Sequence, residues 1–178
     1  MTERIHEGPI DEAAVMAWGY DEDLLFDEQD EDIVLGAHGE VFPALARLAQ
    51  DSACPKADYA LGIIDFSLMF WVLRQHPGAA ERIHWMLQLF EGASRPKLEE
   101  FRKVNLLRLE LMRGEPCLTR ENALKLGNAA LNGVSRSVEL SLIEEDEVWV
   151  VELSVPPFHR HKEWLKILKK TGGFTFVR

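Results

Sequence analysis

The sequence has few cysteines and no long apolar run, and each absence excludes a class of protein. The two cysteines, Cys54 and Cys117, lie far apart without a CxxC pattern, so we expect no disulfide framework. The most apolar stretch, residues 59–73, contains Asp65 and is shorter than the ~20 residues of a membrane span. The first residues are polar and lack the basic-then-apolar order of a signal peptide. We therefore expect a cytoplasmic protein that does not enter a membrane.

Motifs of common enzymes are also missing. The sequence contains no HExxH zinc motif, no GxSxG nucleophile elbow and no glycine-rich phosphate loop. The acids from Asp21 onward begin like a calcium-binding loop, but Leu25 and Phe26 occupy positions that require an oxygen ligand and a glycine. The sequence thus predicts no catalytic residue, no metal site and no cofactor.

Basic residues are scarce at the start of the chain. The protein has 20 Lys and Arg against 30 Asp and Glu, which gives a formal net charge of −10. Residues 1–35 contain 12 of the acids and a single base, Arg4, so this segment alone carries −11. Residues 155–178 have the opposite bias, with six bases and one acid. The whole imbalance therefore lies in the first fifth of the chain.

An acidic segment of this kind repels phosphate and attracts a basic protein surface. We therefore expect no binding to nucleic acid and faster association with a basic partner protein at low salt. The carboxylates expected to form the partner-binding face are Asp21, Glu22, Asp23, Asp27, Glu28, Asp30, Glu31 and Asp32. An alternative interpretation is that these acids only keep the protein soluble or pair with its own basic tail.

The acidic segment is interrupted by bulky apolar residues, which a disordered tail rarely carries. We therefore predict that residues 1–35 dock on the body of the protein and contain a short helix that opens at Asp11. Beyond this segment, Pro55-Lys56 and Pro96-Lys97 recur at a spacing of 41 residues. Each pair follows a small polar turn and precedes a long amphipathic stretch, as expected for proline in a first helical turn.

This recurrence predicts two helical hairpins. The first pairs residues 40–51 with 56–75, and the second pairs 79–91 with 96–113. The spacing is near that of HEAT and armadillo repeats, although a plain helical bundle fits equally well. The side chains expected to face the core are Leu45, Leu48, Leu61, Ile64, Leu68, Val72, Ile83, Leu87, Phe90, Leu98, Phe101, Leu106, Leu109 and Met112.

The last third of the chain predicts a helix followed by an antiparallel sheet. Thr119 is a suitable N-cap for a helix over 120–131, which stops at Asn132-Gly133. Beyond it the apolar period becomes two, with a hairpin turn at 144–147 and further strands up to residue 177. Residues 164–169 fit a helix or a strand, and we favour a strand.

The predicted fold class is α+β. It comprises an acidic segment over 1–35, a helical-hairpin domain over 36–116, and a helix with a four-stranded antiparallel meander over 117–178.

Three groups of residues are candidates for chemistry. His159 and His161 would share one face of a strand and could bind one metal ion. Cys54 precedes a helix entrance that would stabilise a thiolate, although a small buried cysteine is the commoner case. Asp65 lies in an apolar helix, where it either hydrogen-bonds across the helix pair or marks a site. These residues define the alternative function, a small metal-dependent or hydrolytic enzyme. A subunit of a larger helical assembly is a further alternative.

The C-terminal third also resembles a known group of proteins. Its features are a helix over 121–131, the strand 138–143, Val148-Trp-Val-Val-Glu152 before Pro156-Pro157, and the closing run 167–173 with its Lys-Thr-Gly-Gly turn. Together they resemble the small helix-plus-meander domains of PepSY-like and NTF2-like immunity proteins from bacterial polymorphic toxin systems. The resemblance covers about 60 residues. It implies a non-enzymatic cytoplasmic protein that binds and blocks one partner, and many toxin domains of such systems carry a basic cleft.

Overall fold

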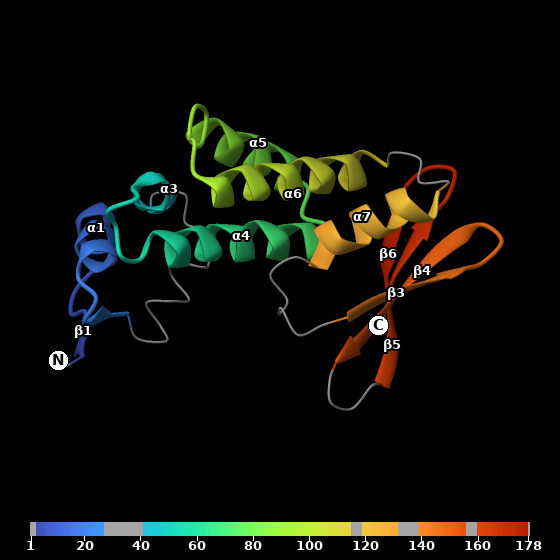
Figure 1. Ribbon diagram of the computed structural model, residues 1–178, viewed down its shortest axis with the longest axis horizontal. Helices are drawn as coiled ribbons and strands as arrows, with labels where there is room; N and C mark the ends of the chain where they lie inside the picture. Colours follow the sequence, from blue (N-terminus) through green and yellow to red (C-terminus); the bar gives the residue numbers. More distant parts are fainter. Residues whose placement is uncertain (1–2, 27–40, 115–118, 132–138, 156–159, 178) are drawn as a thin grey trace. The chain divides into compact units, whose positions relative to one another are not determined.

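The computed structural model describes residues 3–26, 41–114, 119–131, 139–155 and 160–177 (Figure 1). The chain divides into two compact units. Unit 1 comprises residues 1–68 and 84–101, and unit 2 comprises residues 69–83 and 102–178. The predicted domain boundaries, at 35/36 and 116/117, both lie outside the described residues.

Unit 1 begins with a small βαβ element. Strand β1 (Arg4–Ile5) pairs in parallel with β2 (Leu24–Leu25), and helix α1 (Glu12–Tyr20) connects them (Figure 1). The helix opens where the sequence predicts, because the Asp11 carboxylate accepts a hydrogen bond from the Ala14 amide at 2.8 Å. Trp18 of α1 is buried, so α1 contributes to the core of this unit.

Helix α1 packs on α3 (Phe42–Gln50) at a point of close approach. A Cβ atom added to Gly19 would overlap the methyl groups of Leu48, which is fully buried. Glycine therefore lets the two helices approach more closely than any other residue would.

The four helices of the predicted hairpins occur where the proline and glycine pattern placed them. They are α3, α4 (Ala57–Leu73), α5 (Ala79–Leu89) and α6 (Pro96–Arg113). Most of the predicted core side chains are buried, and Leu45, Leu48, Ile64 and Val72 are fully so.

Three predicted core residues are not buried, since Leu87 and Met112 are half-buried and Leu106 is exposed. Leu106 is 49% exposed, whereas Arg108, on the same helix, is completely buried. The Arg108 guanidinium donates to the Asn105 side-chain oxygen at 3.0 Å and to the Ala129 carbonyl at 2.9 Å. Helix α6 is thus rotated so that Asn105 and Arg108 continue the buried stripe of Leu98 and Phe101 (i, i+3, i+7, i+10).

The sheet of unit 2 confirms the predicted meander. Strands β3 (Glu139–Glu144), β4 (Val148–Val155), β5 (Arg160–Leu168) and β6 (Phe174–Phe176) lie side by side in that order, each antiparallel to the next. The ambiguous segment is therefore a strand, as favoured from the sequence. A bulge interrupts the β4–β5 register between Val151 and Glu152.

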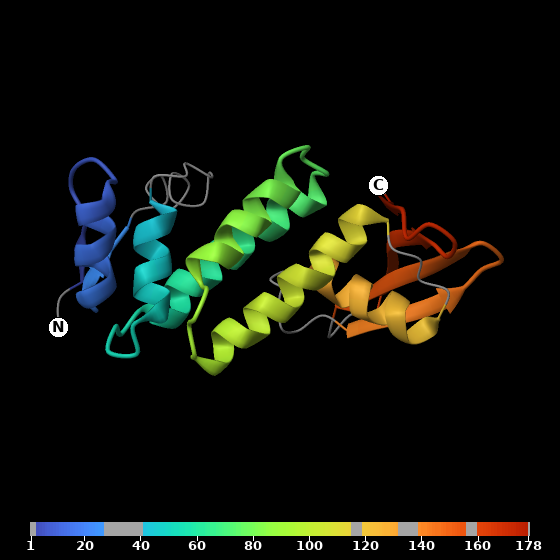
Figure 2. The same ribbon diagram turned by 90° about the horizontal axis from the view of Figure 1, so that it is seen from above.

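Helix α7 (Arg120–Leu131) lies over this sheet and packs on β3 and β4 (Figure 2). Its N-cap is Thr119, whose hydroxyl accepts a hydrogen bond from the Asn122 amide at 3.2 Å. Gly127 faces the sheet, since an added Cβ would lie 3.2 Å from a Val151 methyl. Leu142, Val151 and Leu165 occupy one cross-strand row on this face, and all three are buried.

Among the described residues, no helix has both the length and the apolar character to cross a membrane.

Candidate functional site

The described part of the predicted partner-binding face is the turn that links α1 to β2. Its backbone is fixed by the parallel strand pair, in which the Arg4 amide donates to the Asp23 carbonyl and the His6 amide donates to the Leu25 carbonyl, both at 2.8 Å. The Asp23 amide also donates to the Asp21 carboxylate at 3.1 Å. The acidic turn 21–23 therefore has a defined conformation.

Lys56 anchors this turn from the entrance of α4. Its ammonium donates to the Asp21 carbonyl at 2.7 Å and to the Leu24 carbonyl. It also lies 4.9 Å from the ring centre of Trp18, which stacks on Phe26 at 5.2 Å. Carbonyls at a helix C-terminus and an aromatic face both attract a cation, so the lysine is a suitable occupant.

Burial lowers the pKa of Lys56, and the carboxylates of Asp21, Asp23 and Glu22 oppose that shift. The ammonium is thus partly removed from water and is compensated by backbone carbonyls, and it bonds to no carboxylate of the described residues. Lys56 therefore holds the backbone of the turn, while the Asp21 carboxylate pairs with Arg4.

The three described acids of the predicted face differ in their surroundings. Asp21 forms an ion pair with Arg4, the only base of the acidic segment. Asp23 is half-buried, whereas Glu22 is exposed and forms no ion pair within the part of the chain that the structure describes. Asp21 therefore offers a partner less negative charge than the sequence count suggests. The remaining predicted residues, Asp27, Glu28, Asp30, Glu31 and Asp32, lie outside the described residues.

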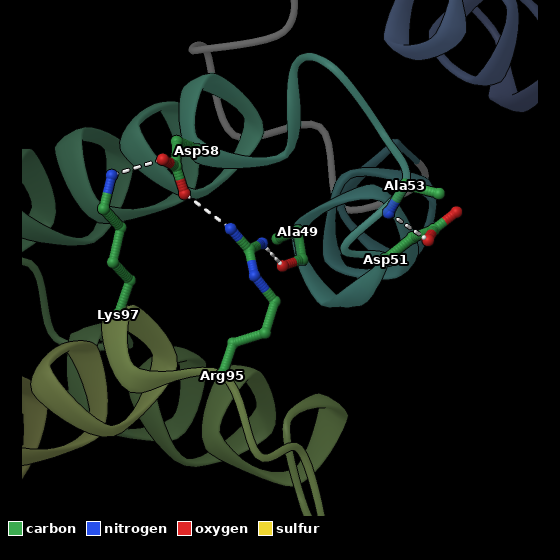
Figure 3. Close-up of polar contacts among 6 residues, drawn as sticks. All are labelled: Ala49, Asp51, Ala53, Asp58, Arg95 and Lys97. Carbon is green, nitrogen blue, oxygen red and sulfur yellow. Dashed lines mark hydrogen bonds and ion pairs between the residues drawn. The ribbon is translucent and has the colours of Figure 1, made fainter.

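The second Pro-Lys turn forms a charge cluster on the same unit (Figure 3). Arg95 donates to one carboxylate oxygen of Asp58 at 2.6 Å and to the carbonyl of Ala49, and Lys97 pairs with the other oxygen of Asp58. Lys97, and then Arg95, lower the pKa of Asp58. Arg95 is the more buried of the two bases, with 21% of its side chain exposed against 53% for Lys97.

Tyr20 and Asp51 connect α1 to the end of α3. The Tyr20 hydroxyl donates to the Asp51 carboxylate at 2.5 Å, and the same carboxylate accepts from the Ala53 amide at 2.8 Å (Figure 3 shows the second bond). The hydrogen bond raises the pKa of Tyr20 and lowers the pKa of Asp51. Both groups are therefore held in the protonation states that keep the bond.

Cys54 does not have the surroundings of an activated nucleophile. Its buried thiol donates to the Gly19 carbonyl at 3.1 Å, and burial raises its pKa. A thiol of this kind packs and hydrogen-bonds, in agreement with the structural interpretation of this residue. Cys117 lies outside the described residues.

The residues of the alternative enzyme lie only partly within the described ranges. His161 belongs to β5, and His159 lies outside the described residues. Asp65 is half-buried on α4. Within the described ranges, no group of three histidine, cysteine, aspartate or glutamate side chains is placed to hold a metal ion.

Sequence reasoning missed the counter-ions and the anchor. Arg4 and Arg47 neutralise Asp21 and Glu12. In the sequence, Lys56 stands out only as part of the Pro-Lys repeat. The signal for Arg4 was its position as the single base among 12 acids, but nothing in the sequence distinguishes Lys56 from Lys97.

Comparison with models of protein families, with curated proteins and with solved structures gave no significant match.

Proposed function

We propose that this protein binds and blocks a basic partner protein through an acidic face formed by residues 21–32, in the manner of an immunity protein. The proposal rests first on the charge distribution, since 12 of the 30 acids lie in residues 1–35 with one base. The blocking role rests on the resemblance of residues 121–173 to immunity domains. An acidic face would occupy the basic cleft of a nucleic-acid-cleaving toxin in place of phosphate.

The observation that carries the proposal is the anchored turn at the start of this face. Lys56 binds backbone carbonyls of the turn and forms no ion pair with Glu22 among the described residues. Glu22 stays exposed on a backbone fixed by β1 and β2. A fixed carboxylate loses less conformational entropy on binding than one on a flexible chain, which favours recognition.

The test compares two variants with the same change in charge. The first carries Glu22→Gln, Asp27→Asn and Glu28→Gln. The matched control carries Glu145→Gln, Asp146→Asn and Glu147→Gln in the exposed β3–β4 turn. A partner is captured from native lysate of the source cells, identified and purified, and its affinity for each protein is measured against salt concentration.

We expect the wild-type affinity to fall steeply with salt, and the first variant to bind roughly tenfold more weakly at low salt with a shallower salt slope. The control should retain the wild-type slope apart from a small general charge effect. A flat salt response of the wild type, or equal losses in both variants, would remove the acidic-face mechanism.

A further inference from the structure

The two edges of the β3–β6 sheet differ in how their backbone groups are satisfied. At the β3–β4 turn, the Glu145 amide donates to the Val148 carbonyl at 3.0 Å, which defines a hydrogen-bonded pair. Along an antiparallel ladder, hydrogen-bonded and non-hydrogen-bonded residue pairs alternate. Leu142 lies three residues before Glu145, so its backbone amide and carbonyl point away from β4. Arg120 of α7 donates to this Leu142 carbonyl at 3.0 Å. A guanidinium thus caps the β3 edge.

The β6 edge has no such cap. The Leu168 amide donates to the Gly173 carbonyl at 2.7 Å, and the Val177 amide donates to the Trp164 carbonyl at 2.9 Å. By the same alternation, the backbone amides and carbonyls of residues 173, 175 and 177 point toward β5. Those of Phe174 and Phe176 point outward, away from the sheet. No hydrogen bond reaches these four groups from the part of the chain that the structure describes.

The usual protections of an edge strand are a very short length, charged side chains, proline or a covering element. Residues 173–177 contain neither a charge nor a proline. Aromatic contacts hold the strand in place, because Phe176 lies 5.5 Å from Phe174 and 6.0 Å from Trp164, ring centre to ring centre. Within the described ranges the short length of β6 is thus its one protection, and the outward backbone groups of Phe174 and Phe176 are available to a second strand.

We propose that β6 pairs antiparallel with β6 of a second copy of this chain, around a twofold axis at Thr175. In this register Phe174 of each subunit lies opposite Phe176 of the other subunit, as twofold symmetry requires. The outward groups at positions 174 and 176 then form two hydrogen-bonded pairs that flank a non-hydrogen-bonded Thr175 pair. This is the order that an antiparallel ladder requires, and all four outward groups of each copy are satisfied.

The side chains of this register also suit a self-complementary strand. Aromatic pairs and threonine pairs directly opposite one another stabilise antiparallel strands. No like charges face each other over 173–177. Because the paired strand is short, the interface belongs to the small, transient class.

The test is a concentration series of the purified full-length protein into the millimolar range, followed by sedimentation equilibrium and by amide hydrogen exchange. We expect the average mass to rise toward that of a dimer. In parallel, the amides of Phe174 and Phe176 should become protected. The Leu142 amide, which also points outward but on the capped β3 edge, serves as the internal control and should not change with concentration.

A substitution separates pairing from folding. Thr175 is exposed and lies opposite Lys166 within the sheet, so Thr175→Glu adds an attractive contact inside each subunit. In the dimer it sets two carboxylates directly against each other and should weaken association roughly tenfold or more. Gln88→Glu, on the exposed surface of α5, introduces the same charge and should leave association unchanged.

Three results would overturn the proposal. One is a monomer at every concentration with unprotected Phe174 and Phe176 amides. Another is protection of these amides in a species of monomer mass, which would indicate that another segment covers the edge. The last is a Thr175→Glu protein that dimerises as tightly as the wild type.

Discussion

The two Pro-Lys turns of unit 1 have the same local sequence pattern and different environments. Lys56 is partly buried against two carbonyls and the Trp18 ring, whereas Lys97 is 53% exposed and pairs with a carboxylate. When a partly buried cation loses its hydrogen bonds to fixed carbonyls, the protein loses much stability, because water does not replace those bonds. An exposed ion pair contributes little to stability. The role of a lysine in this repeat is thus set by its degree of desolvation and not by its position in the repeat.

The largest expected effect is that of Lys56→Met. It removes two charge-assisted hydrogen bonds and keeps most of the side-chain volume, so we expect a loss of about 3 kcal/mol in the free energy of unfolding. The measurement is urea unfolding followed by tryptophan fluorescence, since Trp18 reports on this contact. Lys97→Met is the matched control. Equal losses in the two variants would contradict the assigned difference.

Gly19→Ala tests the docking of α1 without touching a charge. The added methyl overlaps Leu48, which costs about 1–3 kcal/mol, and better helix propensity returns up to about 1 kcal/mol. We expect a net loss of about 1 kcal/mol by the same unfolding measurement. Combined with Lys56→Met, the loss should be less than additive, because both changes release the same helix. Full additivity would show that the two contacts act independently.

Tyr20→Phe should reduce the free energy of unfolding by a smaller amount, and this loss should depend on pH in both the acidic and the alkaline range. The lowered pKa of Asp51 means that its contribution is present above its ordinary value of 3.8 and is lost as pH falls through the folded-state pKa. The raised pKa of Tyr20 means that its contribution is present below 10.0 and is lost as pH rises through the folded-state pKa. The stability difference between wild type and variant, measured across pH, should therefore be largest near neutrality. A difference independent of pH would refute the hydrogen bond.

The smallest expected effect is that of Lys97→Met. Exposed ion pairs contribute about 0–1 kcal/mol, and Arg95 remains to neutralise Asp58. Salt sharpens the contrast, since the Debye length falls to about 3 Å at 1 M. In such salt the effect of Lys97→Met should vanish, while that of Lys56→Met should persist. If the stability loss of Lys56→Met also vanished in salt, the Lys56 ammonium would be exposed to water, contrary to the burial described above.

Local signals explain why much of the fold was predictable. Asp11 and Thr119 cap helices by bonds to their own next turn, and Pro96 starts a helix for reasons internal to that turn. The antiparallel strands carry a period of two, which needs no knowledge of distant residues. Contacts between residues far apart in the sequence were not predictable. The two-residue strands β1 and β2 are defined by backbone bonds alone, without a side-chain pattern.

Burial of charge was the other source of error. Arg108 is buried because its guanidinium meets the Asn105 oxygen on its own helix and the Ala129 carbonyl of α7, and the carbonyl is not visible in the sequence of α6. A hydropathy pattern therefore assigned Leu106 to the core instead. The site shows the same limit. The excess of acid in residues 1–35 was evident from the sequence, but its partial neutralisation by Arg4 and Arg47 depends on tertiary contacts.

Carboxyl footprinting of the complex with its partner tests the acidic face most directly. Exposed carboxylates of the free and the bound protein are labelled by a carbodiimide and a neutral amine, and the sites are located by mass spectrometry. We predict strong protection of Glu22 and the acids of 27–32 on binding, with unchanged labelling of Glu145, Asp146 and Glu147. Unchanged labelling over 21–32 in a saturated complex would contradict the proposed function.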